Sequence, residues 1–368
     1  MRSMKILNLV IAVGIAGLGC ICCGAGITVD YAPLSPELVS VPQNLLSLIH
    51  TREVQTELAF SPEQLSSWEK TLREIDARWW PSRILPASDQ RKSVAELEVK
   101  MMVELESLLG PDAVRRLRQI ELQSQSGRTL ARPEVAKFLG LDAKQAKKLS
   151  ELFAETDQLA ADSVSKNAKE NDDKVQALIA VKQAEPKKAR AILTPAQAEK
   201  LKTFFGKPFE TSKLERIYPF APELISSGFW TNERQPKLET LLGQVVLVHF
   251  YAFQCHNCVA NFNHYKRWDS TLKAKGVQVI GIQTPETSSE KDPEKVRSAA
   301  AKEGFQFPVL IDVENKNWSA WGNTMWPTVY VVDKQGYIRF WWQGELNWQG
   351  ATVDKKVDAI IEKLLNES

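Results

Sequence analysis

The chain has few cysteines and almost no net charge. The first argues against a disulfide-bonded scaffold and the second against a nucleic-acid-binding protein. Its 368 residues carry 47 Lys and Arg against 45 Asp and Glu, a net charge of +2. So close a balance provides no broad basic surface, so we expect no nucleic-acid partner. Three of the five cysteines (Cys20, Cys22 and Cys23) lie in one apolar segment, and the other two form a single Cys-x-x-Cys. The sequence therefore offers no framework of structural disulfides.

The apolar segment at the N-terminus is typical of an export signal. Arg2 and Lys5 precede an uncharged run from Ile6 to Val29, and Asp30 is the first acidic residue after it. A helix of that length would measure about 36 Å, enough to span a bilayer. We therefore expect residues 1–30 to be a cleaved signal peptide or a membrane anchor. Basic residues before the run place the rest of the chain outside the cytoplasm.

A lipoprotein is a third alternative for this segment. Gly19-Cys20 resembles the end of a bacterial lipobox, but Gly17 stands where that motif usually has Leu. In all three cases the protein is predicted to be exported, either periplasmic or membrane-anchored. Two lone cysteines at Cys-x-x-Cys spacing in an oxidising compartment indicate a redox pair rather than a scaffold.

Residues 41–206 are predicted to form an all-α region, because apolar positions recur there every three or four residues. This region repeats itself. Val54–Gln64 aligns with Val135–Gln145 at an offset of 81 residues, and Leu109–Ile120 aligns with Leu193–Phe204 at an offset of 84. We therefore expect a duplicated helical unit.

The repeated segments share one way of starting a helix. A capping Ser, Asp or Thr is followed three residues later by Gln, as in SPEQ at 61–64 and TPAQ at 194–197. The segments resemble the LTxxQ-type repeats of small helical periplasmic proteins of the Spy and CpxP kind. A helix cap followed by an amphipathic helix explains the same pattern without any binding role. The polar stretch Ala160–Lys188 is predicted to be a long exposed helix or a flexible connector.

The pattern changes after Gly206, and a second domain is predicted over residues 210–368. Its first strand, Val245–Tyr251, is a continuous apolar and β-branched run, as expected for a strand buried on both faces of a sheet. The order of elements is that of an α/β thioredoxin fold with an inserted αβ element. The elements expected after the first strand are a helix that starts at the Cys pair, a strand at Val277–Thr284, a helix at Asp292–Gly304, a strand at Phe307–Ile311, a hairpin of Val329–Asp333 and Tyr337–Trp342, and a helix at Val353–Leu365.

The sequence Cys255-His256-Asn257-Cys258 follows the first strand. Disulfide exchange needs one exposed thiolate to attack and a second thiol to resolve the mixed disulfide. At a helix start, positions i and i+3 share one face, and the free amides and the helix dipole favour the first thiolate. We therefore assign Cys255 as the nucleophile and Cys258 as the resolving thiol. A protonated His256 would stabilise the Cys255 thiolate and make the pair more oxidising; the alternative for His256 is a solvent-exposed loop residue.

A zinc site is the main alternative for these cysteines. Cys255, Cys258 and His264 would supply three ligands, but a second Cys or His pair is missing and a buried strand precedes the motif. We therefore predict no metal and no cofactor.

Trp326-Pro327 is the second signature, because it directly precedes a predicted strand. In this fold that position holds a cis-proline. The backbone of Trp326 would pair with an extended substrate there, and Pro327 offers no competing N–H. We therefore assign both residues to substrate binding.

The region from about Trp230 to Trp348 resembles the TlpA-like thioredoxins, and most closely the periplasmic domain of DipZ-type proteins. The resemblance rests on LGQVVLV at 242–248, the Cys-x-x-Cys, TPE at 284–286, EKDP at 290–293, and Trp326-Pro327. It implies an exported thiol–disulfide oxidoreductase that reduces cysteines of client proteins and receives electrons from a membrane partner. It covers about a third of the chain and does not extend to the helical region.

His249 departs from the pattern of this family, and Glu286 matches it. His249 stands where thioredoxins have a buried Asp, so proton shuttling by that carboxylate does not carry over; we expect a core histidine with a backbone partner. Glu286 matches a Glu that many TlpA-like reductases have near their cysteines. We predict that Glu286 accepts the proton of Cys258, with an ordinary loop acid as the alternative.

Two other functions remain to be weighed against the oxidoreductase. In one, the helical repeats bind unfolded or envelope proteins and the thioredoxin domain is accessory. Blocking Cys255 separates the two, because chaperone-like binding would survive it. In the other, the protein is a thiol peroxidase. Peroxidases of this superfamily use a Thr-x-x-Cys motif, whereas this chain has Phe253-Gln254-Cys255 followed by a second cysteine, so this alternative is weaker.

Overall fold

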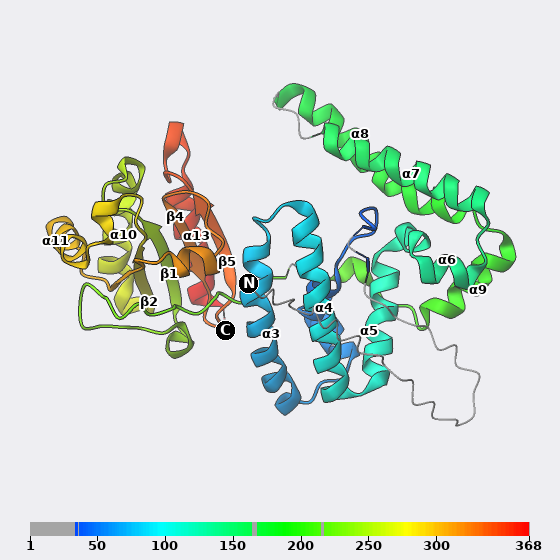
Figure 1. Ribbon diagram of the computed structural model, residues 1–368, viewed down its shortest axis with the longest axis horizontal. Helices are drawn as coiled ribbons and strands as arrows, with labels where there is room; N and C mark the ends of the chain where they lie inside the picture. The colour runs from blue at the N-terminus through cyan, green and yellow to red at the C-terminus, as the bar shows by residue number, and fades with distance from the viewer. Residues whose placement is uncertain (1–33, 36, 164–167, 215–216, 368) are drawn as a thin grey trace, which may run out of the picture. The chain divides into compact units, whose positions relative to one another are not determined.

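The computed structural model describes residues 34–35, 37–163, 168–214 and 217–367 (Figure 1). The predicted signal or anchor segment, residues 1–30, lies outside the described residues. Among the helices that are described, none combines the length and the apolar character needed to cross a membrane. The described chain comprises a helical region and, after it, a region built on a five-stranded sheet.

The region up to residue 206 is largely helical, as its periodicity predicts. Its apolar faces pack around buried side chains such as Trp68, Leu97 and Leu117. Its α-helices are α1 (Leu45–Ile49), α2 (Arg52–Glu57), α3 (Pro62–Ser82), α4 (Ala87–Leu109), α5 (Pro111–Ser124), α6 (Pro133–Leu139), α7 (Ala143–Asp162), α8 (Ala168–Arg190) and α9 (Pro195–Phe205).

The repeated segments occupy equivalent places in two sets of helices, α2 to α5 and α6 to α9. Gln64 and Gln145 each close a capping box at the start of α3 and α7. The Gln64 side-chain amide also donates to the Leu108 carbonyl at 3.2 Å, and that of Gln145 donates to the Ile192 carbonyl at 2.9 Å. In both sets the glutamine therefore links the start of one helix to the end of the next.

The polar stretch predicted as an exposed helix or a connector contributes to two helices. α7 and α8 lie side by side (Figure 1), with residues 164–167 between them outside the described part. α8 is held at its second half, where the buried Glu185 accepts from Arg128 Nε at 2.8 Å. From Lys174 to Arg190, most side chains of α8 are exposed, which agrees with their polar composition.

The C-terminal region has the predicted order of elements around a sheet of order β3-β2-β1-β4-β5. β1 pairs in parallel with β2 and antiparallel with β4, β2 pairs in parallel with β3, and β4 pairs antiparallel with β5. Most boundaries lie within one or two residues of those expected. The elements are β1 (Val245–Tyr251), α10 (His256–Leu272), β2 (Val277–Gln283), α11 (Pro293–Glu303), β3 (Val309–Ile311), α12 (Lys316–Ala320), β4 (Thr328–Val332), β5 (Ile338–Gln343) and α13 (Val353–Asn366).

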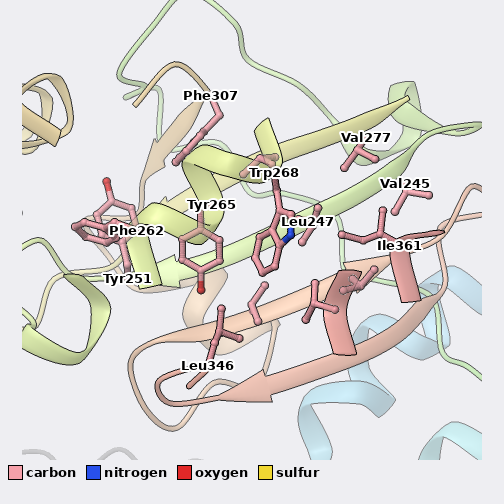
Figure 2. Close-up of a cluster of buried hydrophobic side chains, with 14 of the residues drawn as sticks. Val245, Leu247, Tyr251, Phe262, Tyr265, Trp268, Val277, Phe307, Leu346 and Ile361 are labelled. Atoms are coloured by element: carbon pink, nitrogen blue, oxygen red, sulfur yellow. The ribbon is translucent and has the colours of Figure 1, made fainter. Parts of the chain in front are cut away.

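The sheet is covered on both faces, which explains why its central strand is apolar apart from His249. Every residue of β1 is buried. Alternate side chains enter two cores. Leu247 packs with Tyr265 of α10 and Ile361 of α13 (Figure 2), whereas Val248 packs with Trp321 on the other face. Because strand side chains alternate between faces, only an uninterrupted apolar run fills both cores.

One short helix, α12, is absent from the sequence expectations. Asp312 sets its start, because the Asp312 carboxylate accepts the backbone N–H of Asn317 at 3.1 Å and of Trp318 at 3.0 Å. A helix this short carries too little periodicity to be recognised from the sequence.

The last turn of α3 contacts the segment after α12. The Trp80 indole donates to the Trp321 carbonyl at 3.1 Å. The Arg83 guanidinium donates to the Gly322 carbonyl at 3.0 Å and to the Tyr330 hydroxyl at 3.1 Å. The helical region and the sheet region therefore share partly buried hydrogen bonds.

Candidate active site

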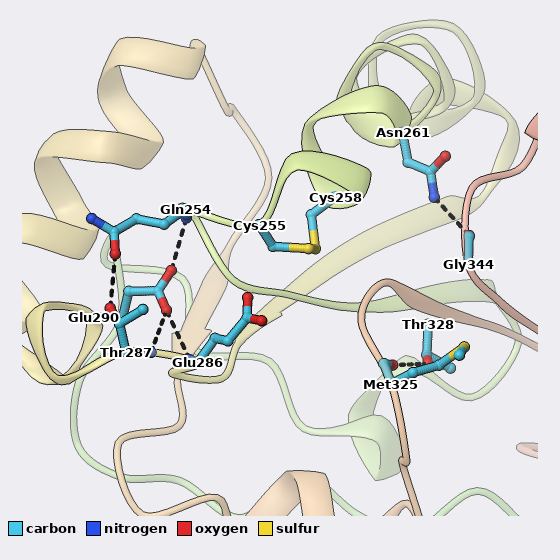
Figure 3. The surroundings of a disulfide bond; sticks show 10 residues. All are labelled: Gln254, Cys255, Cys258, Asn261, Glu286, Thr287, Glu290, Met325, Thr328 and Gly344. Atoms are coloured by element: carbon cyan, nitrogen blue, oxygen red, sulfur yellow. Dashed lines mark hydrogen bonds between the residues drawn. A yellow bond between two sulfur atoms is a disulfide. The ribbon is translucent and has the colours of Figure 1, made fainter.

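The cysteine pair lies where β1 leads into α10. Cys255 is the N-cap of α10, and its carbonyl accepts the backbone N–H of Cys258 at 3.0 Å and of Val259 at 3.2 Å. The two sulfurs form a disulfide, with the Cα atoms 5.3 Å apart (Figure 3). Cys255 is half-buried and Cys258 is fully buried. Solvent and large molecules therefore reach the first sulfur and not the second.

The position at a helix start decides the electrostatics of the reduced pair. The first amides of a helix and its dipole favour negative charge at the N-cap. His256 is the first residue of α10 and is exposed. A positive charge on His256 would add to the same field.

The Trp326–Pro327 peptide bond is cis, as the sequence pattern predicts. Pro327 is buried and Trp326 is half-buried, with its ring stacked on Trp318 at a centroid distance of 4.1 Å. The cis bond directly precedes Thr328, which lies opposite Phe250 near the end of β1. The register of the sheet therefore brings this loop to the strand end that carries the cysteines.

Glu286 lies on the loop that follows β2. Its side chain is exposed, and Figure 3 shows it extending from the loop on the side of the disulfide. The loop is held by Glu290, which is fully buried and accepts the Glu286 N–H at 2.7 Å. The structure thus brings Glu286 to the same end of the sheet as the cysteine pair.

Sequence reasoning missed the role of Glu290 in this arrangement. Its carboxylate also accepts the N–H of Gln254, which precedes Cys255, at 2.8 Å. Thr287 and Glu290 form a capping box, and a Thr followed three residues later by Glu is its sequence signature. That signal was present and would have identified Glu290 as a residue that organises the loop.

His249 is a core histidine, as expected, but the expected backbone partner is wrong. Its side chain is fully buried and stacks on Tyr265 at a centroid distance of 3.8 Å. Within the described residues, neither ring nitrogen has a hydrogen-bond partner. Burial lowers the pKa of His249 to about 3. The imidazole is therefore neutral at physiological pH and packs as an aromatic ring.

The zinc alternative required Cys255, Cys258 and His264 to converge. His264 Nδ1 lies 3.8 Å from Asp354 Oδ2, on the side of α10 that faces α13. Across the described part of the chain, no three His, Cys, Asp or Glu side chains are grouped so that they could hold a metal ion.

The similarity to known proteins is confined to part of the chain. Residues 225–341 match the AhpC/TSA family. Protein DipZ of Mycobacterium bovis is 32% identical over 151 residues, which are 40% of this chain and 21% of DipZ. The thiol-disulfide oxidoreductase YkuV of Bacillus subtilis is 23% identical over 140 residues, 38% of this chain and 93% of YkuV.

Solved structures show a likeness of similar extent. A thiol-disulfide isomerase from Corynebacterium glutamicum is 23% identical, with a TM-score of 0.36, and the match covers 41% of this chain and 98% of that protein. This chain therefore spans only about a fifth of DipZ but nearly the whole of the smaller relatives. The C-terminal region therefore matches the AhpC/TSA family over residues 225–341, and its strand order and cysteine pair are those of a thioredoxin-like domain.

Proposed function

We propose that this chain is an exported thiol–disulfide oxidoreductase that exchanges disulfides with cysteine-containing client proteins, acting as a reductant. The observation that carries the proposal is the asymmetry of the pair: Cys255 is half-buried at a helix start, and Cys258 is fully buried one turn behind it. A client can approach the first sulfur, and only Cys255 is within reach of the second. Thiol–disulfide exchange requires this division of roles.

The reaction begins with the reduced pair. The Cys255 thiolate attacks one sulfur of the client disulfide, a bond forms between Cys255 and the client, and the other client sulfur leaves as a thiolate. Cys258 then attacks Cys255, closes the Cys255–Cys258 disulfide and releases the second client thiolate. Two electrons pass from the pair to the client, and the oxidised protein needs a dithiol donor to return to its starting state.

The remaining candidate residues have supporting roles. Glu286 accepts the proton that Cys258 loses when it becomes a nucleophile. His256 tunes the redox poise through its position beside the thiolate. Trp326 and Pro327 form the edge along which an extended client segment pairs with the backbone. Each role is supported by the position of the residue at one end of the sheet.

Export and the direction of electron flow rest on the sequence. The basic residues and apolar run within residues 1–30 support export, by signal peptide or anchor. The resemblance to DipZ-type proteins supports reduction, with a membrane protein as the electron donor.

The alternative function, client binding by the helical repeats, is the weaker candidate. The glutamines that define the repeat pattern are used inside the fold, because Gln64 and Gln145 both close capping boxes and bridge to the carbonyls of neighbouring helices. Their pattern is therefore explained by folding alone. The thioredoxin-like domain remains the functional centre of the proposal.

Reduction of insulin by the purified protein tests the proposal. Wild type should reduce insulin disulfides with dithiothreitol as donor, and Cys255→Ser should abolish the activity. Cys258→Ser should trap a mixed disulfide between Cys255 and insulin, seen as a higher-mass band without reductant. If the Cys255→Ser variant were as active as wild type, the assignment would be wrong.

The reduction potential tests the direction. Equilibration with glutathione should give a value near that of thioredoxin, about −270 mV, for a reductant. A value near about −120 mV would instead make the protein an oxidant.

A further inference from the structure

A buried carboxylate lies beside the redox loop and has no part in the exchange chemistry described above. Glu290 is 0% exposed and belongs to η5 (Ser288–Lys291), a short 3-10 helix after β2. Burying a carboxylate without hydrogen-bond partners would destabilise the fold by several kcal/mol. The hydrogen bonds that Glu290 accepts therefore explain why it is tolerated in this position.

Three backbone N–H groups converge on this carboxylate (Figure 3). Oε1 accepts from Gln254 at 2.8 Å, and Oε2 accepts from Glu286 at 2.7 Å and from Thr287 at 3.0 Å. Hydrogen bonds to a charged acceptor are stronger than neutral ones. One side chain therefore ties together two loops that are separated by about thirty residues of sequence.

A second set of hydrogen bonds joins the same two loops. The side-chain oxygen of Gln254 accepts from the Thr287 hydroxyl at 2.8 Å and from the Ser289 hydroxyl at 3.1 Å. Gln254 is thus held through its backbone by Glu290 and through its side chain by the η5 loop. This double attachment restricts both the position and the orientation of the peptide before Cys255.

The two loops carry the two groups that must meet during resolution. Gln254 directly precedes Cys255, and the Glu286 N–H is bound by Glu290 itself. Reactions at positioned groups are sensitive to small displacements, and about 1 Å of misplacement can cost about 100-fold in rate. A residue that fixes both loops therefore controls a distance on which proton transfer depends.

We propose that Glu290 is a positioning residue of the redox site: its buried carboxylate holds the Cys255 loop and the Glu286 loop as one unit, so that the Glu286 carboxylate stays beside the cysteine pair. This inference rests on the proposed function, because it assigns a part in the same exchange reaction. Glu290 acts through Glu286 and does not contact the client.

The step that Glu290 serves is the release of the client. The Cys258 thiol gives its proton to the Glu286 carboxylate, and the Cys258 thiolate attacks Cys255 in the mixed disulfide. The Cys255–Cys258 bond forms as the Cys255–client bond breaks. The client sulfur leaves as a thiolate and takes a proton from Glu286 or from water. Glu290 neither gives nor takes a proton in this sequence.

The test is Glu290→Gln in the full chain, with insulin as the substrate. The amide is isosteric but carries an N–H₂ group where the carboxylate accepts, so at least one of the three backbone donors loses its acceptor. We expect kcat to fall about tenfold with KM little changed. The matched control is Glu294→Gln, four residues on, where an exposed carboxylate pairs with Arg297 on the same helix and where wild-type kcat is expected.

A double-mutant cycle separates positioning from a general structural effect. If Glu290 acts through Glu286, then Glu290→Gln should cause little further loss of rate in a Glu286→Gln background. The defect of Glu290→Gln alone should also shrink between about pH 7 and about pH 9, because the higher concentration of hydroxide can then replace Glu286 as the proton acceptor. Additive losses, or a wild-type kcat in Glu290→Gln, would overturn the inference.

Two further outcomes are distinguishable. If the wild-type protein has no exchange activity, the proposed function is wrong. If the wild type is active and Glu290→Gln has the same kcat, only the positioning role of Glu290 is wrong. If Glu290→Gln fails to fold by circular dichroism, Thr287→Val decides, because it removes one of the two hydroxyls that join the loops and a cap of the Glu290 turn, while it keeps the Glu290 carboxylate. A lower kcat at unchanged KM supports the inference, and wild-type kinetics overturn it.

Discussion

His249 on β1 lies directly opposite Gly281 on β2, and the absence of a side chain at Gly281 leaves room for the imidazole. A methyl group added at Gly281 would lie 3.1 Å from His249 Nε2 and 3.0 Å from Val309 Cγ2. The ring cannot retreat easily, because its other face stacks on Tyr265. A buried histidine at this point of the sheet therefore depends on a glycine in the adjacent strand.

Gly281→Ala is expected to destabilise the protein. The added methyl group overpacks a fully buried site, at a cost of roughly 1–3 kcal/mol in the free energy of unfolding. Loss of chain entropy in the unfolded state offsets only about 0.4–1 kcal/mol of this. Urea denaturation measures the difference. In a His249→Ala background the cost of Gly281→Ala should be smaller, and an equal cost in both backgrounds would show that the histidine is not the obstacle.

His249 is expected to make the protein less stable in acid. Burial lowers the pKa of His249 to about 3 in the folded protein, whereas an unfolded histidine titrates near about 6.5. Between these values the unfolded chain binds more protons, so stability falls as the pH drops from about 6.5 toward about 3. The slope is at most about 1.4 kcal/mol per pH unit. His249→Phe should flatten the pH dependence of the free energy of unfolding in this window.

His50 provides the matched control for that measurement. Burial lowers the pKa of His50, but the charge of Asp76 and its hydrogen bond at 2.9 Å outweigh burial and leave the pKa raised. A histidine with a raised pKa stabilises the fold below about pH 6.5 and loses this effect as the pH rises through its folded value. His50→Gln should therefore keep the acid instability that His249→Phe removes. The same response in both variants would contradict the assignment to His249.

Arg83→Ala is expected to weaken the contact between α3 and the sheet region. The change removes the donor to the buried Gly322 carbonyl, and a buried polar group left without its partner costs about 1–3 kcal/mol. The Tyr330 hydroxyl loses one bond but keeps those to Trp321 and Asn323. The midpoint of urea denaturation should fall accordingly. Arg78→Ala serves as the control, because its ion pair with Glu96 is exposed and worth less than about 1 kcal/mol. Equal midpoints for the two variants would refute the contact as a source of stability.

His256→Ala is expected to make the redox couple more reducing. A positive charge at the first residue of α10 favours the Cys255 thiolate and hence the reduced form. Its removal should lower the fraction of thiolate at a given pH, and a tenfold loss of stabilisation corresponds to about 30 mV for a two-electron couple. Thiolate absorbance against pH and equilibration with glutathione measure the two effects. Unchanged values in the variant would leave His256 as a solvated loop residue.

The strands and helices of the C-terminal region were largely predictable because local patterns encode them. A strand buried on both faces must be almost wholly apolar, and Val245–Tyr251 satisfies that requirement with His249 as its one buried histidine. Helix starts in the helical region were also predictable, since Ser61 and Thr194 cap α3 and α9 as the sequence indicates. The cis bond at Pro327 was predicted from its place after the cysteines and before a strand.

Other features were hidden because they depend on groups far apart in the chain. No local pattern indicates that Glu290 binds the N–H of Gln254, or that Arg83 reaches Tyr330. The short helix α12 has too few residues for a recognisable period. The backbone partner expected for His249 was wrong, because the core surrounds the ring with aromatic side chains instead.

The sequence by itself determined the local features on which the proposed chemistry rests: a lone Cys-x-x-Cys at the end of an apolar strand, a proline before a later strand, and helix caps in the repeated segments of the helical region. These depend on residue type and spacing, which the backbone converts directly into local structure. The tertiary structure alone decided which groups surround the cysteines. Glu290 binds the Gln254 loop only because the register of β1 with β2 brings the ends of both strands together. Long-range hydrogen bonds follow from packing, and packing is a property of the whole fold.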